Sequence, residues 1–177
     1  MKYSLWLCPP ATSAAFGALD KLLLHASKRL ESERFEPHLT LFSPVIADSD
    51  EDAVDQVREF AKVLTPGGIN VNIAALETGH KYYQCVVLGV ARSKGLLEAN
   101  SAACQHWNKL DLPPFFPHVS VVYGDFVNQQ LDAALSLVDG MLPKDLKDLS
   151  FEATEIRVVS TVGPCNQWRT AGVVRIG

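Results

Sequence analysis

The sequence predicts an α+β fold built from a duplicated unit, with two facing antiparallel sheets that line a central cleft and helices on the outer sides. Three observations support this class. Strand-like and helix-like patterns alternate along the 177 residues. A unit of one strand, one helix and a two-stranded hairpin occurs twice, and both copies begin with the same short motif. We therefore expect residues 1–177 to form a single domain of two pseudo-symmetric lobes that meet near residues 80–95.

The first half of the chain opens with an apolar run at residues 3–7, which is typical of a strand and is closed by two prolines. Ser13 can cap the helix that follows, whose apolar residues recur at steps of three and four to about residue 31. After a strand expected at 38–45, the segment Asp48-Ser49-Asp50 opens a second helix, which a Pro-Gly-Gly segment ends.

The middle of the chain contains two runs rich in β-formers, 69–77 and 82–90, and the segment Thr78-Gly79-His80-Lys81 between them predicts a hairpin turn. A helix is expected over 93–110, because Leu112-Pro113-Pro114 breaks the pattern there. The remaining elements are expected as a strand at 118–124, a helix at 127–142, a strand near 150–161 and a last strand at 168–176.

Composition excludes several classes of protein. Apolar residues make up 47% and charged residues 20%, as in ordinary soluble globular proteins. No apolar run approaches ~18 residues, so we expect no association with a membrane. The N-terminal apolar stretch is too short for a signal peptide, which favours an intracellular, cytoplasmic location. A net charge of −4 argues against an extended nucleic-acid surface but is compatible with one phosphorylated small molecule in a local pocket.

Metal and cofactor sites are not indicated by the cysteines or the carboxylates. No two of the four cysteines (Cys8, Cys85, Cys104 and Cys165) have the C-x-x-C spacing of a structural zinc site, and spacing alone leaves a disulfide open. We therefore expect neither a metal nor a cofactor.

Two stretches of the chain share one pattern. Residues 35–42, FEPHLTLF, and residues 115–122, FFPHVSVV, both read aromatic, any residue, Pro, His, aliphatic, hydroxyl, aliphatic. Positions i and i+2 of a strand point to the same face, so each copy pairs an imidazole with a hydroxyl. Two such strands, in one sheet or in two facing sheets, would bring four groups to a common cleft: His38, Thr40, His118 and Ser120.

Two imidazoles suit acid–base chemistry, since one can be neutral while the other is protonated near neutral pH. Hydroxyls are good donors to phosphate oxygens. Our mechanistic hypothesis is that neutral His118 takes a proton from water while protonated His38 gives one to the leaving oxygen, although the near-symmetry of the motifs makes the opposite assignment almost as good. A serine nucleophile with a histidine base, zinc held by two histidines, and purely structural histidines are the alternatives. A two-metal phosphodiesterase is disfavoured because no acidic cluster accompanies the motifs.

The paired His-x-Thr/Ser motifs in a duplicated α+β chain resemble the 2H phosphoesterase superfamily. The stretches YSLWLCPP, FEPHLTLFSPV, YYQCVVLGV and FPHVSVVYGD are similar to the cyclic phosphodiesterases of plants and fungi. This resemblance implies a metal-independent hydrolase. Its substrates would be ADP-ribose 1″,2″-cyclic phosphate, opened to ADP-ribose 1″-phosphate downstream of tRNA splicing, and nucleoside 2′,3′-cyclic phosphates, opened to 2′-phosphates. His38 and His118 would be the acid–base pair, with Thr40 and Ser120 as phosphate donors.

The resemblance also implies that Trp6, Tyr83 and Tyr123 contact the substrate, a small nucleotide with a cyclic phosphate, and that the protein is a monomer. Two other functions stay open: a non-catalytic nucleotide-binding module with the same fold, and an RNA-end 2′,3′-cyclic phosphodiesterase. In the bacterial RNA-ligase-like members, the motif resembles His-x-Thr-Leu followed by an aromatic residue, Leu and Gly. Here Phe42 is followed by Ser43-Pro44 instead, and this departure favours a small nucleotide as substrate. Three further histidines are assigned no role: His25, His80 and His106.

Overall fold

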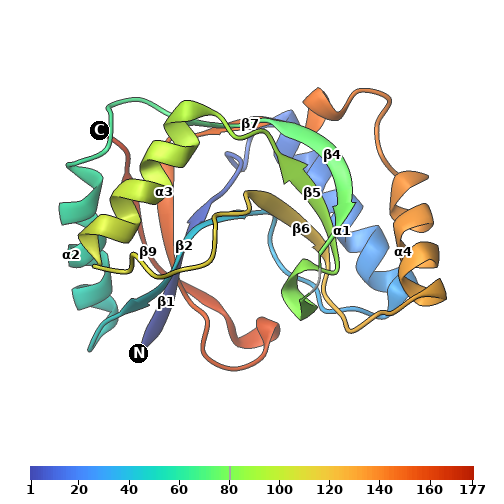
Figure 1. The fold of residues 1–177 in the computed structure, drawn as a ribbon, viewed down its shortest axis with the longest axis horizontal. Helices are drawn as coiled ribbons and strands as arrows, with labels where there is room; N and C mark the ends of the chain where they lie inside the picture. Colours follow the sequence, from blue (N-terminus) through green and yellow to red (C-terminus); the bar gives the residue numbers. More distant parts are fainter. Residues whose placement is uncertain (80) are drawn as a thin grey trace.

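The computed structural model of the chain describes residues 1–79 and 81–177 (Figure 1). It confirms the α+β class, with antiparallel strands and helices on the outer sides. His80, in the expected hairpin turn, lies outside the described residues. The helices are α1 (Ala14–Leu30), α2 (Asp50–Ala61), α3 (Lys94–His106) and α4 (Gln129–Asp139). The strands are β1 (Lys2–Leu7), β2 (Leu39–Ile46), β3 (Ile69–Val71), β4 (Ile73–Thr78), β5 (Val86–Val90), β6 (His118–Val122), β7 (Phe151–Ala153), β8 (Glu155–Ser160) and β9 (Arg169–Arg175).

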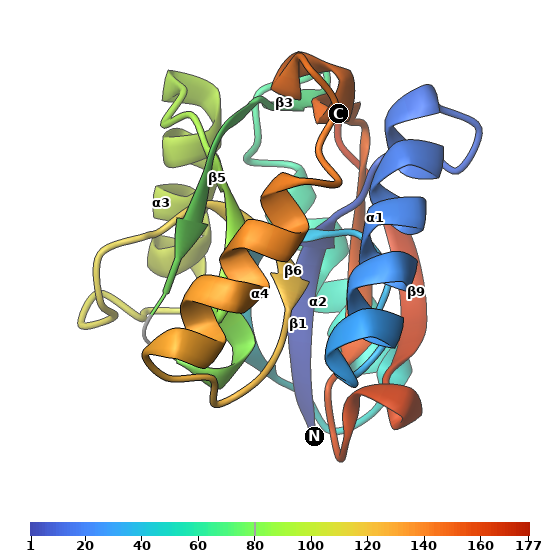
Figure 2. The ribbon, with the colours of Figure 1, turned by 90° about the vertical axis from the view of Figure 1, so that its right-hand side faces the viewer.

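The main sheet has the strand order β4-β5-β6-β2-β1-β8-β9, and its two wings meet at the β2–β6 junction. That junction contains one paired position, Leu39 opposite Val119. The wings arch away from it around a hollow side, and the helices lie outside the arch (Figure 1). Helices α1 and α4 lie together over the β4-β5-β6 wing (Figure 2), while α2 and α3 cover the other wing. The two sheets expected to face each other are therefore the two wings of one main sheet.

The strand order is pseudo-symmetric about the junction. Reading outward from it, β6 corresponds to β2, β5 to β1, and β4 to β8. The halves of the chain interleave, because β8 from the second half pairs with β1, and β4 from the first half pairs with β5. The helices cross over as well: α1 packs on β6 and α3 packs on β2. The duplicated motif strands thus lie side by side at the centre.

Two of the expected long strands are each divided in two. The run 69–77 breaks at Asn72 because the Ile73 N–H donates to the hydroxyl of Ser150, 2.9 Å away, while the chain passes from one sheet to the other. Strand β3 before this break pairs with β7 in a separate two-stranded sheet. The run 150–161 divides into β7 and β8 at the corresponding place. Residues 82–84, expected in a strand, form a 3-10 turn before β5.

Helices α1, α2 and α3 begin as predicted, whereas α4 begins at Gln129 rather than 127, and both α3 and α4 end earlier than expected. The hydroxyls of Ser13 and Ser49 cap α1 and α2, each accepting an N–H at 3.1 Å. Helix α3 ends at His106 rather than near 110, because Asn108 takes the left-handed conformation (φ 49°) and the N–H of Lys109 donates to the Cys104 carbonyl at 2.8 Å. Helix α4 is likewise shorter than the expected 127–142. No helix in the described ranges is both long and apolar enough to cross a membrane.

Candidate active site

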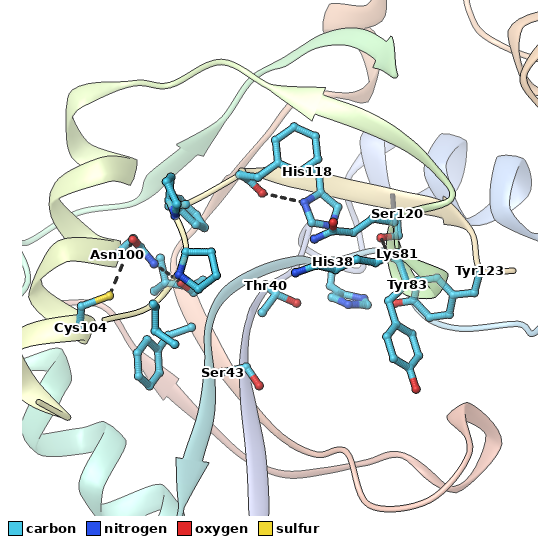
Figure 3. Close-up of a pocket in the computed structure, with 18 residues that line it drawn as sticks. His38, Thr40, Ser43, Lys81, Tyr83, Asn100, Cys104, His118, Ser120 and Tyr123 are labelled. Carbon is cyan, nitrogen blue, oxygen red and sulfur yellow. Dashed lines mark hydrogen bonds between the residues drawn. The ribbon is translucent and has the colours of Figure 1, made fainter. Parts of the chain in front are cut away.

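The four groups of the duplicated motif lie together at the β2–β6 junction (Figure 3). Leu39 and Val119 face each other across this antiparallel pair and are fully buried toward the helices. Side chains alternate along a strand, so their neighbours emerge on the hollow side. Extended by one residue in each direction, this register sets Thr40 opposite His118 and His38 opposite Ser120. The motif strands are thus neighbours in one sheet, and directly opposed side chains have Cβ atoms about 4.5–5.5 Å apart.

Both histidines are oriented in the same way by the backbone. Nδ1 of His38 lies 2.6 Å from the carbonyl oxygen of Glu36, and Nδ1 of His118 lies 2.7 Å from that of Phe116. A carbonyl oxygen only accepts hydrogen bonds, so Nδ1 carries the hydrogen in each ring. The acceptor residues both precede a proline, which restricts their backbone to extended conformations. Nε2 of each imidazole is therefore the nitrogen available for proton transfer.

The surroundings of the two imidazoles differ. His38 is only 5% exposed and stacks on Trp6, with ring centroids 3.5 Å apart and planes 9° from parallel. Burial lowers the pKa of His38 from 6.5 to about 4, with smaller lowering by His118 and Arg157, against the carbonyl bond to Glu36. Burial also lowers the pKa of His118, opposed by its own carbonyl bond and by the Glu77 carboxylate. Both rings are therefore favoured as neutral bases at neutral pH.

The buried His38 predicts a loss of folding stability in mild acid. Its pKa is about 4 in the folded chain and 6.5 when unperturbed, so the unfolded chain binds more protons between these values. The contribution of neutral His38 to the free energy of unfolding is fully present above pH ~6.5. This free energy falls by roughly 3 kcal/mol as the pH decreases to ~4. Urea unfolding at a series of pH values measures this slope. His38→Phe, which keeps a ring against Trp6, should flatten it, and an unchanged slope in that variant would contradict the assignment.

The two hydroxyls are not equivalent. The Ser120 hydroxyl donates to the carbonyl oxygen of Tyr83 at 2.8 Å and the residue is 5% exposed. The half-buried Thr40 hydroxyl makes no hydrogen bond with the described part of the chain. Thr40 is thus free to donate to an incoming oxyanion, whereas Ser120 must first release the Tyr83 carbonyl.

The three aromatic residues predicted to contact substrate occupy different positions. Tyr83 lines the cleft and is 52% exposed. Tyr123 also lines it but is buried and stacks on Phe35, with centroids 3.8 Å apart. Trp6 lies against His38 and lines an adjacent cavity together with Trp168. Tyr83 and Trp168 approach to 6.0 Å between centroids. Contact of these side chains with substrate stays a prediction.

The cleft has a volume of about 350 Å³ and includes residues that the sequence did not single out. Lys81 and Gln84, on the segment before β5, line it beside the motif residues. Apart from the histidines, Lys81 is the one basic residue among the described lining residues, and no local sequence pattern marks it. Asn100 and Cys104, from α3, lie at the other end of the cleft (Figure 3). In the described ranges, no group of three or more His, Cys, Asp or Glu side chains could hold a metal ion.

The geometry agrees with what sequence comparison finds. A family model described as cyclic phosphodiesterase-like protein matches residues 1–176. The chain belongs to this family. Membership confirms the resemblance to the 2H phosphoesterases and makes the chain a phosphodiesterase of the hydrolase class.

Several relatives of the cyclic phosphodiesterase-like chain align along most of its length. The cyclic phosphodiesterase of Arabidopsis thaliana is 24% identical over 161 residues, covering 90% of this chain and 84% of the plant protein. The 2′,3′-cyclic-nucleotide 3′-phosphodiesterase of Yarrowia lipolytica is 25% identical, covering 98% of this chain and 99% of its own. The crystal structure of E. coli LigT complexed with 3′-AMP has a TM-score of 0.61 at 14% identity, covering 99% of this chain and 97% of LigT. This last likeness shows the fold.

Proposed function

We propose that the protein hydrolyses ADP-ribose 1″,2″-cyclic phosphate to ADP-ribose 1″-phosphate, and nucleoside 2′,3′-cyclic phosphates to 2′-phosphates, without a metal ion. The observation that carries this proposal is the pairing of Leu39 with Val119, which places two imidazoles and two hydroxyls on one face of the sheet. The names of the relatives support cyclic phosphates as the substrate class. A cleft of about 350 Å³ suits part of a small nucleotide.

In this reaction one imidazole takes a proton from water through Nε2 as the water oxygen bonds to phosphorus. The other imidazole gives a proton from Nε2 to the ribose oxygen as its bond to phosphorus breaks. Opening a 2′,3′-cyclic phosphate to the 2′-phosphate makes the 3′ oxygen the leaving group. The hydroxyls of Thr40 and Ser120 donate to the non-bridging oxygens, where negative charge increases in the transition state. One imidazole gains a proton from water and the other loses one to the ribose oxygen, so the number of protons on the pair is unchanged. Each turnover therefore exchanges the protonation states of the two histidines.

A phosphorus NMR time course tests the proposal. Wild type and the variant His38→Ala/His118→Ala are incubated with ADP-ribose 1″,2″-cyclic phosphate or 2′,3′-cyclic AMP in the presence of EDTA. We expect only wild type to open the rings, giving the 1″- and 2′-phosphates. Activity that EDTA abolishes and added metal restores would overturn metal independence.

Two further outcomes would replace the proposal. Saturable binding of both ligands without turnover would favour a non-catalytic nucleotide-binding module. Turnover confined to an oligonucleotide that ends in a 2′,3′-cyclic phosphate would favour an enzyme acting on RNA ends. Phosphorus spectra recorded with each substrate decide whether turnover occurs, because each product phosphate has its own chemical shift, and a titration with the same ligands measures binding.

A further inference from the structure

Two residues of opposite charge, Arg157 and Glu77, lie at corresponding positions in the two halves of the pseudo-symmetric sheet. In the first motif, Trp6 of β1 lies opposite Thr40 on one side and Arg157 of β8 on the other. In the second motif, Val87 of β5 lies opposite Ser120 on one side and Glu77 of β4 on the other.

Thr40 and Ser120 hold corresponding positions in the two motifs, so Arg157 and Glu77 hold corresponding positions in the two halves of the sheet. Directly opposed residues share a face, and both charged residues therefore emerge on the cleft side. The two histidines are alike in their backbone bonds but face opposite charges.

The Glu77 carboxylate lies over a glycine in the neighbouring strand. A Cβ atom built on Gly89 would be 2.2 Å from Oε1 of Glu77, so the carboxylate occupies the place of the missing side chain. Gly89 is the residue directly opposite His118 in the β5–β6 pair. The carboxylate is therefore seated next to His118 on the cleft face. A glycine inside a strand often marks such a close approach.

The charges around His38 are different. Arg157 forms an ion pair with Glu36 at 2.7 Å, and its side chain is 24% exposed. The other charged or titratable groups near His38 are His118 and the Glu36 carboxylate itself. Near His118 they are Glu77, Lys81 at the cleft wall, and Arg92, whose guanidinium donates to the Phe115 carbonyl at 2.7 Å. Glu77 makes no ion pair with the described residues.

We propose that Glu77, seated over Gly89, is a positioning residue that favours the protonated imidazole of His118, so that His118 is the general acid and His38, beside Arg157, is the general base. This inference rests on the proposed function. It reverses the assignment expected from the motifs alone, which could not distinguish two nearly symmetric histidines. The carboxylate acts through His118 and needs no contact with the substrate.

The substitution Glu77→Gln keeps the shape of the side chain and removes its charge. Without the carboxylate His118 loses its proton at lower pH, so the alkaline limb of the kcat/KM profile should move down by roughly half a pH unit with an unchanged plateau. Gly89→Ala should give the same shift, because its methyl group displaces the flexible end of Glu77. Proton–nitrogen NMR of the His118 ring measures the same change without substrate.

Glu152→Gln is the matched control. Glu152 also lies over a glycine, with its Cγ 2.2 Å from a Cβ built on Gly68, but it belongs to the two-stranded sheet. This variant should leave the profile and the His118 titration unchanged.

The outcomes separate this inference from the function on which it rests. If wild type opens no cyclic phosphate, the proposed function fails, and the ring titration alone decides whether Glu77 favours protonated His118. If wild type is active and neither Glu77→Gln nor Gly89→Ala moves the alkaline limb, the inference is overturned. If His118 is the base, Glu77→Gln should instead raise the plateau and leave the alkaline limb in place, which would also overturn the assignment.

Discussion

Replacing His118 by alanine is expected to lower kcat for a cyclic phosphodiester by about 10²–10⁴-fold, the usual contribution of a positioned acid or base. His118 is partly exposed at the cleft and its ring is held by the Phe116 carbonyl, so truncation removes the reacting nitrogen without opening the core. KM should change little, because proton transfer belongs to the transition state. Steady-state kinetics with 2′,3′-cyclic AMP measures both constants.

His38→Ala should cost a similar factor in kcat, but this variant also removes a buried ring that stacks on Trp6. Thermal unfolding must therefore accompany its kinetics. The double variant should be little worse than either single one, since an acid and a base that act in one step are not additive. His25→Ala is the control: this histidine is exposed on α1, and its loss should leave kcat unchanged. Near-normal turnover by His118→Ala would contradict the two-histidine mechanism.

Local rules are sufficient for part of the geometry of the predicted site. Because successive side chains of a strand point to opposite faces, His38 and Thr40 share one face, and the same holds for the second motif. Duplication implied that the two motifs meet near a pseudo-symmetry axis. Whether they meet in one sheet or across two depends on strand pairing between distant residues, here the single pair Leu39–Val119, which no local pattern encodes.

Other features of the fold could not be predicted from the hydrophobic pattern alone. The periodicity of α3 continues past His106, yet the helix ends there because Asn108 takes the left-handed conformation, a capping signal that the apolar pattern does not contain. Strand propensity continues through Asn72, yet the strand divides because the N–H of the next residue bonds to a side chain from the other half of the chain.

Predicting the charged residues beside the two histidines would also have required knowledge of the strand register. Gly89 is the one local signal, since a glycine within a strand suggests the close approach of another group. It does not say that the group is a carboxylate, or that Arg157 takes the equivalent place in the other half of the sheet.

Removing the Thr40 hydroxyl is expected to lower kcat more than removing the Ser120 hydroxyl. Thr40 makes no hydrogen bond within the described chain, so its hydroxyl can donate to a non-bridging oxygen without breaking another bond. Thr40→Val keeps the shape of the side chain and should cost about 10²–10³-fold, as for a transition-state oxyanion donor. Thr40→Ser, which keeps the hydroxyl, should retain most of the activity.

Ser120 can make the same donation only by giving up its 2.8 Å bond to the Tyr83 carbonyl. The lost bond offsets part of the gain, by about 0.5–1.5 kcal/mol for an ordinary hydrogen bond, or about a factor of 10 at most in rate. Ser120→Ala should therefore reduce kcat by about 10–10²-fold, and it should also loosen the 3-10 turn that carries Tyr83, which raises KM. Kinetics of Thr40→Val and Ser120→Ala with one substrate tests the order. An equal or larger loss of kcat in Ser120→Ala would mean that substrate binding releases Ser120 from Tyr83 without cost, and that the resting hydrogen bond does not distinguish the two donors.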